Sequence, residues 1–408
     1  MQTNLSAEFR NTAQGNEAEA ILRACVHCGF CTATCPTYQL LGDELDGPRG
    51  RIYLIKEVLE GKAPTDKTRT HLDRCLTCRN CESTCPSGVQ YGKLVDIGRD
   101  IVEKKTALTH PRPLMERLKR NALKEGLNSS LFTPAMKLGQ MMRPLVPKSL
   151  QSKVPEARAI GAIPTAQFAR NVLVLEGCVQ PAMAPTINAS LRRVLAKLNI
   201  GVRTASAAKC CGAVRFHMND QSGGRDDMRA LVDAWWPMIE RGEIETIVMT
   251  ASGCGVTVRE YPHFLQDDAA YLPKAEKIAA LTMDVSEFIA TQSAALARLI
   301  KKTPRVAFHP PCTLQHGQQV KGVTESVLRE CGLSLTAVSD SHLCCGSAGA
   351  YSVLNPEIAF ALRDRKLSSI SGEPDYIASA NIGCITHLQS GTKTPVRHWI
   401  EIIDACIA

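Results

Sequence analysis

The chain has 408 residues, which is long for one domain, so two or three domains are expected. Hydrophobic residues make up 44% and charged residues 22%, as in an ordinary globular protein, and no run of eighteen apolar residues offers a membrane span. The formal charge of +8 is uneven: residues 104–170 carry +10 and the rest −2. A general nucleic-acid-binding surface is therefore excluded, and one basic segment remains to be explained.

A four-cysteine pattern occurs twice in the first hundred residues. Cys25-x2-Cys28-x2-Cys31-x3-Cys35 is followed by a proline, and the same spacing and proline return 50 residues later, from Cys75. In two-cluster ferredoxins the fourth cysteine of each run binds the other cluster. We therefore expect two [4Fe–4S] clusters, one at Cys25, Cys28, Cys31 and Cys85 and one at Cys75, Cys78, Cys81 and Cys35.

Zinc and disulfides are the alternatives for these cysteines, because a single C-x2-C pair is compatible with either. Zinc sites do not repeat a four-cysteine run that ends in proline. The opening residues, MQTNLSAEFR, contain no apolar core of a secretory signal, so a reducing compartment is expected and disulfides are disfavoured.

Helical patterns flank both runs. Glu17–Ala24 leads into the first run, and Gly50–Glu60 places its apolar residues on one helical face. Asp66 is expected to cap the helix that leads to Cys75. These helices predict an α-helical ferredoxin domain over residues 1–103, since the small β-rich ferredoxins have far less chain between their runs.

The basic segment, residues 104–170, is rich in proline, so we expect a linker without long regular structure. Pro113–Lys124 and Leu131–Arg143 have the pattern of amphipathic helices. The segment is interpreted either as a solvated linker or as a contact for an acidic partner or an anionic membrane surface.

A second cysteine pattern occurs twice at a period of 134 residues, in a first repeat (residues 171–282) and a second repeat (residues 283–408). The strand-like segments Asn171–Glu176 and Arg305–His309 open the two copies, and helical segments alternate with strands after them. This alternation predicts a duplicated α/β cysteine-rich (CCG) domain with parallel strands. The cysteines, which fall at strand ends and helix starts, are Cys178, Cys210, Cys211 and Cys254, then Cys312, Cys344, Cys345 and Cys384.

Three interpretations of these eight cysteines stay open: one or two further iron–sulfur clusters, one cluster with a degenerate second copy, or structural thiols or zinc. Cys331 and Cys406 lie in apolar helical patterns and are expected in the core. The histidines of the second repeat are expected either to relay protons or to pack against backbone carbonyls; they are His309, His316, His342 and His387.

The duplicated CCG pattern resembles the cysteine-rich domain of heterodisulfide reductases. In that family the motif ends in C-x2-C, and five cysteines bind a non-cubane cluster. Here the last position is Thr257 in the first repeat and His387 in the second, so only His387 is offered as a fifth ligand. This departure argues against a heterodisulfide reductase-like catalyst at the CCG sites.

ACVHCGFCTATCPTYQLLGDELDGPRGRIYLI and LDRCLTCRNCESTCPSGVQY, with DSHLCCGSAG and ANIGCITHL, resemble the iron–sulfur subunits of bacterial glycolate oxidase (glycolate dehydrogenase). The resemblance implies a complex that oxidises glycolate, or also D-lactate, to the oxo acid. FAD-containing subunits take the hydride, and this subunit passes electrons toward a membrane quinone from the cytoplasmic face of the inner membrane. The corresponding subunits of anaerobic glycerol-3-phosphate and D-lactate dehydrogenases are the alternatives.

The chain has no evident flavin or nicotinamide site of its own. The nearest match to a dinucleotide-binding fingerprint, Gly253-x-Gly255-x-x-Val258, lacks the third glycine. A chain with clusters and no hydride acceptor cannot oxidise an alcohol alone. A flavoprotein partner is therefore implied.

Overall fold

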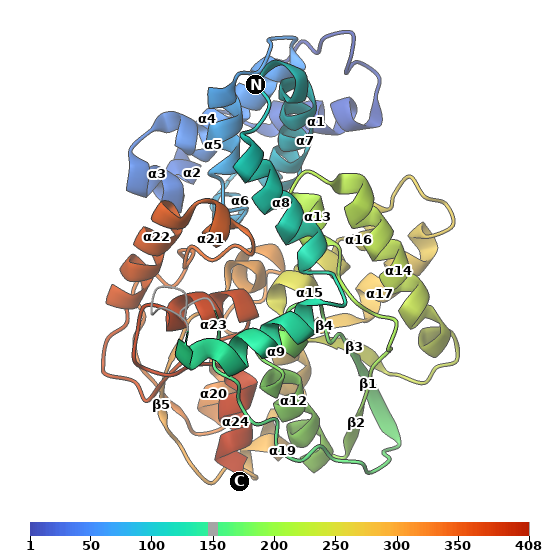
Figure 1. Ribbon diagram of the computed structural model, residues 1–408, viewed down its shortest axis with the longest axis vertical. Helices are drawn as coiled ribbons and strands as arrows, with labels where there is room; N and C mark the ends of the chain where they lie inside the picture. The colour runs from blue at the N-terminus through green and yellow to red at the C-terminus, as the bar shows by residue number, and fades with distance from the viewer. Residues whose placement is uncertain (146–153, 408) are drawn as a thin grey trace.

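The computed structural model describes residues 1–145 and 154–407, so the part of the expected linker at residues 146–153 lies outside the described residues. A helical N-terminal unit lies at one end of the molecule, and two units that each contain a parallel sheet lie side by side below it (Figure 1). No helix among the described residues is long and apolar enough to cross a membrane.

The N-terminal unit is entirely helical over its described elements. They are α1 (Ala13–Ala24), α2 (Phe30–Ala33), α3 (Pro36–Leu41), η1 (Glu44–Asp46), α4 (Pro48–Leu59), α5 (Asp66–Asp73), α6 (Asn80–Ser83) and α7 (Tyr91–Thr109). The expected cap of α5 is wrong by one residue. Thr65 is the N-cap, because its extended backbone lets its hydroxyl accept from the Thr68 amide, and Asp66 already lies in the first turn.

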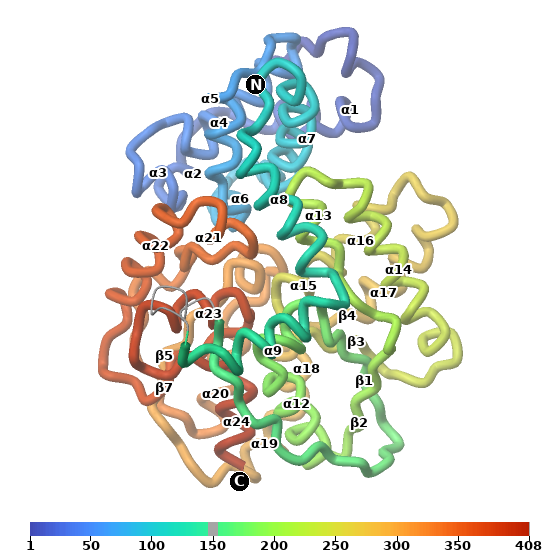
Figure 2. The backbone as a smooth tube through the Cα atoms, viewed as in Figure 1, coloured from blue at the N-terminus to red at the C-terminus, as the bar shows by residue number. Residues whose placement is uncertain are grey.

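Both helices predicted in the basic segment are present. They are α8 (Leu114–Gly126) and α9 (Phe132–Met142), and η2 (Arg143–Leu145) follows them. They run from the N-terminal unit across the two repeats (Figure 2). The basic segment makes hydrogen bonds to the repeats. For example, the side-chain amide of Gln140 in α9 donates to the Ala182 carbonyl at 3.2 Å.

The first repeat contains one four-stranded parallel sheet of order β2-β1-β3-β4. Its elements are β1 (Arg170–Val174), α11 (Gln180–Met183), α12 (Thr186–Lys197), β2 (Ile200–Arg203), α13 (Ala213–His217), α14 (Gln221–Glu240), β3 (Thr246–Met249), α15 (Ser252–Arg259), α16 (Tyr261–Phe264), α17 (Leu272–Leu281), β4 (Thr282–Asp284) and α18 (Val285–Ala290). The expected boundary at 282/283 falls within β4, where Thr282 is in register with Ile247 of β3.

The second repeat has the same strand order, β6-β5-β7-β8. Its elements are α19 (Ser293–Ala297), β5 (Arg305–Phe308), η3 (Thr313–Gly317), α20 (Val323–Glu330), β6 (Ser334–Leu335), α21 (Tyr351–Leu354), α22 (Pro356–Ser368), β7 (Tyr376–Ser379), α23 (Ile382–Gln389), β8 (Val396–His398) and α24 (Trp399–Ile407). The strand centres are fully buried, as Ala307 and Ala378 are, because helices cover the sheet.

The two repeats pack against each other through a shared apolar core. α24 packs on α12, and α18 packs on α20, so the last helix of each repeat lies against the first long helix of the other. Cys331 and Cys406 belong to this core, as expected. His398 donates from Nε2 to the Thr250 carbonyl at 2.8 Å, which joins the C-terminal end of one sheet to that of the other.

Candidate metal centres

The two ferredoxin-like cysteine runs share one backbone geometry. His27 and Gly29 in the first run have φ angles of 56° and 85°, and Thr77 and Arg79 at the same positions of the second have 51° and 58°. Successive turns of this kind direct backbone N–H groups toward the interior of a loop, where they stabilise negative charge. The Thr77 amide, for example, donates to the Cys75 sulfur at 3.4 Å.

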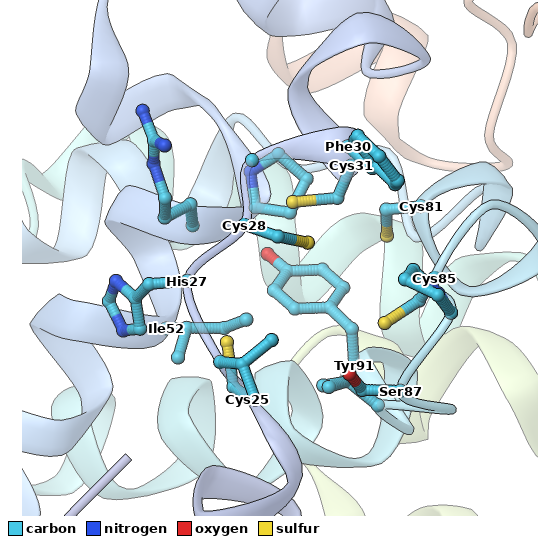
Figure 3. Close-up of a pocket in the computed structure, with 16 residues that line it drawn as sticks. Cys25, His27, Cys28, Phe30, Cys31, Ile52, Cys81, Cys85, Ser87 and Tyr91 are labelled. Atoms are coloured by element: carbon cyan, nitrogen blue, oxygen red, sulfur yellow. The ribbon is translucent and has the colours of Figure 1, made fainter.

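The first predicted ligand set comes together around one cavity. Cys25, Cys28 and Cys31 of the first run and Cys85 of the second all line it, with their sulfur atoms directed inward, and Cys81 of the second predicted set also reaches it (Figure 3). Cys28 is exposed, so the cavity lies at the surface of the N-terminal unit.

The second predicted set lies deeper. Burial raises the pKa of Cys78 and of Cys81, and the neighbouring sulfurs of Cys35 and Cys75 act in the same direction. Thiols in such surroundings become thiolates only when a bound cation compensates the charge. The donor set therefore fits a metal centre better than it fits free cysteines.

A buried ion pair fixes the end of the first run against the second. Asp46 accepts from Arg51 Nη2 at 3.4 Å, from Arg74 Nη1 at 2.8 Å and from His71 Nδ1 at 3.0 Å. Arg51 also donates to the Thr37 hydroxyl, which lies 3.3 Å from the Cys35 sulfur. The DELDGPRGR stretch of the sequence thus positions Cys35 beside the helix that leads to Cys75.

The four cysteines of the first repeat are neighbours: Cys178 and Cys211 lie next to Cys210, and Cys254 lies next to Cys211. Contact with Cys178 and Cys211 lowers the pKa of Cys210, and the same contacts raise the pKa of Cys178 and of Cys211. Cys178 and Cys254 are partly exposed.

The second repeat has the same chain of contacts, from Cys312 through Cys344 and Cys345 to Cys384. Here all four cysteines are buried. The Lys366 ammonium, itself buried, lies close enough for the charges of Cys312, Cys345 and Cys344 to act on it. It supplies a positive charge beside the sulfurs.

The glycine of each CCG doublet is required by the backbone. Gly212 and Gly346 have φ angles of 85° and 89°, which L side chains rarely adopt. A Cβ at Gly346 would overlap the Ala359 carbonyl oxygen, and one at Gly212 would overlap that of Gly224. Each glycine amide donates at 3.4 Å to the sulfur of the first cysteine of its doublet.

The histidines of the second repeat divide into two kinds. His387, offered by sequence as a fifth ligand, uses Nε2 to bond the Ala359 carbonyl at 3.0 Å and stacks on Phe360, so it is a packed residue. His316 bonds the His342 carbonyl of its own repeat at 2.9 Å, and its other ring nitrogen lies 2.9 Å from the Ser83 hydroxyl of the N-terminal unit. His309 is different: it is fully buried, and one ring nitrogen lies within 4.8 Å of the sulfurs of Cys345 and Cys384.

The second cysteine run is in direct contact with the second repeat. Cys78 packs against an apolar cluster that includes Leu76, Cys312 and Cys344, and Tyr351 donates to the Arg74 carbonyl at 3.0 Å. Sequence spacing could not reveal this neighbour, because more than 200 residues separate Cys78 from Cys312.

Two families of domain match this chain. Residues 21–89 match the 4Fe-4S dicluster domain, and residues 172–259 and 306–389 match the cysteine-rich domain. The glycolate oxidase iron–sulfur subunit of Escherichia coli (strain K12) is 52% identical over 100% of this chain and 99% of that relative. The chain belongs to the glycolate oxidase iron–sulfur subunit family.

Other members and relatives are more distant. The probable glycolate oxidase iron–sulfur subunit of Bacillus subtilis (strain 168) is 28% identical over 95% of this chain and 92% of its own length. Lactate utilization protein A of Exiguobacterium sp. (strain ATCC BAA-1283 / AT1b) is 23% identical over 57% of this chain and 97% of its own length. Membership of the glycolate oxidase iron–sulfur subunit family, with the 4Fe-4S domain, identifies this chain as an iron–sulfur protein.

Proposed function

We propose that this chain is the electron-transfer subunit of a complex that oxidises glycolate to glyoxylate. The observation that carries the proposal is the 52% identity, over essentially the full length of both chains, to a glycolate oxidase iron–sulfur subunit. Iron–sulfur clusters accept and release single electrons. FAD-containing subunits of the complex are the proposed donors, and a membrane quinone is the proposed acceptor.

The cysteines of the two repeated patterns divide into four proposed sets of ligands. One [4Fe–4S] cluster is assigned to Cys25, Cys28, Cys31 and Cys85, and a second to Cys75, Cys78, Cys81 and Cys35. Further clusters are assigned to the CCG sites, at Cys178, Cys210, Cys211 and Cys254 and at Cys312, Cys344, Cys345 and Cys384. The convergence of the first set of sulfurs on one cavity and the burial of Cys35, Cys75 and Cys81 support the first two assignments.

The surface at the first cavity is the proposed contact for the flavoprotein. Val26 and Phe30 border the cavity beside the exposed Cys28 and are 68% and 60% exposed. An apolar rim of this kind loses water when a partner covers it, which stabilises an interface. The flavin would then lie near the outermost cysteine set.

The experiment that tests the function uses the whole complex, with Cys28→Ser and Cys78→Ser variants. Glycolate should still bleach the flavin of the partner, while reduction of the quinone falls at least about a hundredfold. If flavin bleaching were also lost from an intact complex, the chain would have a direct catalytic role. The same assay with D-lactate tests the second substrate, which the similarity to lactate utilization protein A favours.

We propose that the two cysteine-rich repeats are a duplicated α/β domain, divided after α18 rather than at residue 282. The common strand order and the pairing of β4 with β3 support this division. Limited proteolysis should cut between Thr291 and Lys302 before it cuts within β4.

Peripheral attachment to the cytoplasmic face of the inner membrane is proposed through the outer face of α8. Leu114, Met115 and Leu118 are 70%, 64% and 53% exposed there, and Arg117 and Lys119 lie exposed beside them. Arg112 and Arg120 belong to internal ion pairs with Asp73 and Glu116 and are not part of this surface.

Binding to liposomes that contain anionic lipid tests this attachment. Arg117→Gln with Lys119→Gln should weaken binding several-fold and remove most of its salt dependence. Neutralising Glu8 and Lys105, a pair on the N-terminal unit, serves as the control and should change nothing. Equal binding by the double variant and the wild type would refute the attachment through α8.

A further inference from the structure

Among the described residues of the second repeat, His309 is the histidine whose ring lies beside CCG cysteines, Cys345 and Cys384. It follows β5 directly, and its side chain has no exposed surface. Neither Nδ1 nor Nε2 has a hydrogen-bond partner among the described residues. A buried imidazole without any partner loses the hydration of both nitrogens and gains nothing in return, and a ligand bound to one nitrogen would compensate this loss.

The distances indicate what that ligand is. One ring nitrogen of His309, the Cys345 sulfur and the Cys384 sulfur all lie within 4.8 Å of one another. Three donors of this kind around one point are the arrangement of a soft metal site, since neutral imidazole and thiolate are both good ligands of iron. His387 is not among these three donors, because it faces the Ala359 carbonyl.

The first repeat provides an internal comparison. With the 134-residue period, the counterpart of His309 is Leu175, which directly follows β1. Leu175 packs with Cys211, and Cys254 packs against the same apolar cluster. The same place beside the doublet is therefore apolar in one repeat and carries an unpartnered nitrogen donor in the other.

We propose that His309 is a ligand of an iron–sulfur centre in the second repeat, together with Cys345 and Cys384. This inference rests on the proposed function and assigns one more ligand within it. It makes the two CCG sites chemically different: the first offers four thiolate donors, and the second offers four thiolate donors and a neutral imidazole. The imidazole adds no negative charge, so a thiolate in its place would lower the reduction potential of this site.

The test compares anaerobically purified wild-type chain with His309→Leu, which reproduces the first repeat, and His309→Cys. Mössbauer spectra of the ⁵⁷Fe-labelled proteins should differ from the wild type at one iron site in both variants. Pulsed EPR of the reduced wild type should show a strongly coupled nitrogen that shifts with ¹⁵N-histidine labelling and disappears in His309→Leu. His309→Cys should keep its iron but show a lower midpoint potential at that site.

The control variant is His387→Gln, which keeps a donor for the Ala359 carbonyl and should leave all these spectra unchanged. Identical Mössbauer spectra in wild type and His309→Leu would overturn the proposal, as would loss of the nitrogen coupling in His387→Gln instead. Iron analysis of His309→Leu separates this proposal from the proposed function. About eight or more iron atoms per chain would show that the two ferredoxin-like clusters do not depend on His309.

Discussion

Cys78 of the N-terminal unit packs against the apolar cluster that contains Cys312 of the second repeat. Each of the two residues lies in a different predicted ligand set, and burial and the proximity of Cys312 both raise the pKa of Cys78. The contacts of the first repeat with the N-terminal unit include polar ones: His217 lies 3.1 Å from Asp96, and Arg79 of the second cysteine run donates to Glu260 at 2.8 Å. The CCG site of the second repeat is therefore the one that packs against Cys78 of the second cysteine run.

We predict that Cys312→Ser alters the magnetic properties of the second ferredoxin-like cluster, whereas Cys178→Ser does not. Paramagnetic centres in close proximity speed each other's spin relaxation, so loss of the neighbour slows it. Microwave-power saturation of the EPR signals of the partly reduced protein measures this effect. Equal saturation behaviour in the two variants would contradict the adjacency.

Gly346→Ala should destabilise the second repeat and lower its iron content. The substitution forces a φ of 89° on a residue with a Cβ and brings that Cβ against the Ala359 carbonyl, for a cost of about 2 to 4 kcal/mol. Gly126→Ala is the matched control, because it adds a methyl group in open space at the end of α8. Thermal melting and iron analysis check both variants; a Gly346→Ala protein with wild-type melting would refute the backbone argument.

Asp46→Asn should weaken the N-terminal unit by about 3 to 5 kcal/mol, because it leaves the Arg51 charge buried without its carboxylate. Iron bound near Cys35 should be lost together with the stability. Asp43→Asn is the control: Asp43 lies near Asp46 but is exposed, and asparagine can still accept from the Leu45 amide, as Asp43 does at 2.9 Å. The prediction fails if the two variants melt at the same temperature.

Acid should lower the free energy of unfolding through protonation of His398, which bonds the Thr250 carbonyl of the other repeat. Burial lowers the pKa of His398 to about 4, against an ordinary value near 6.5, so between these values the unfolded chain binds a proton that the folded chain does not. Stability therefore falls as the pH drops, by about 2 kcal/mol between pH 7 and pH 5 for this group. The stability that the unprotonated His398 contributes is fully present only above pH 6.5, the ordinary pKa of histidine.

His398→Gln isolates this contribution, because glutamine keeps an N–H for the Thr250 carbonyl but does not titrate. The melting temperature of the variant should fall less between pH 7 and pH 5 than that of the wild type. The neighbouring Glu401, whose carboxylate accepts from the His398 amide at 2.9 Å, is unchanged in both proteins. Parallel pH profiles would show that His398 does not carry the effect.

Much of the local structure was predictable because it depends on neighbours in sequence. The helix α8 (Leu114–Gly126) and the strand β5 (Arg305–Phe308) lie where the sequence predicts an amphipathic helix and a strand. The cap of α5 was missed by one residue, since Thr65 and Asp66 are both good capping residues and only the backbone angles distinguish them. The left-handed turns at Thr77 and Arg79 left no signal, as neither residue is a glycine.

The sequence by itself determined the two four-cysteine runs, the 134-residue period and the family, because ligand spacing and family motifs are properties of the chain read in order. Only the tertiary structure decided which distant residues meet. It placed Cys78 against the cluster of Cys312, turned His387 toward a carbonyl, and brought His309 to Cys345 and Cys384. The physical reason is burial: the packing of α/β repeats against a helical unit determines which side chains share an interior, and no local pattern encodes that choice.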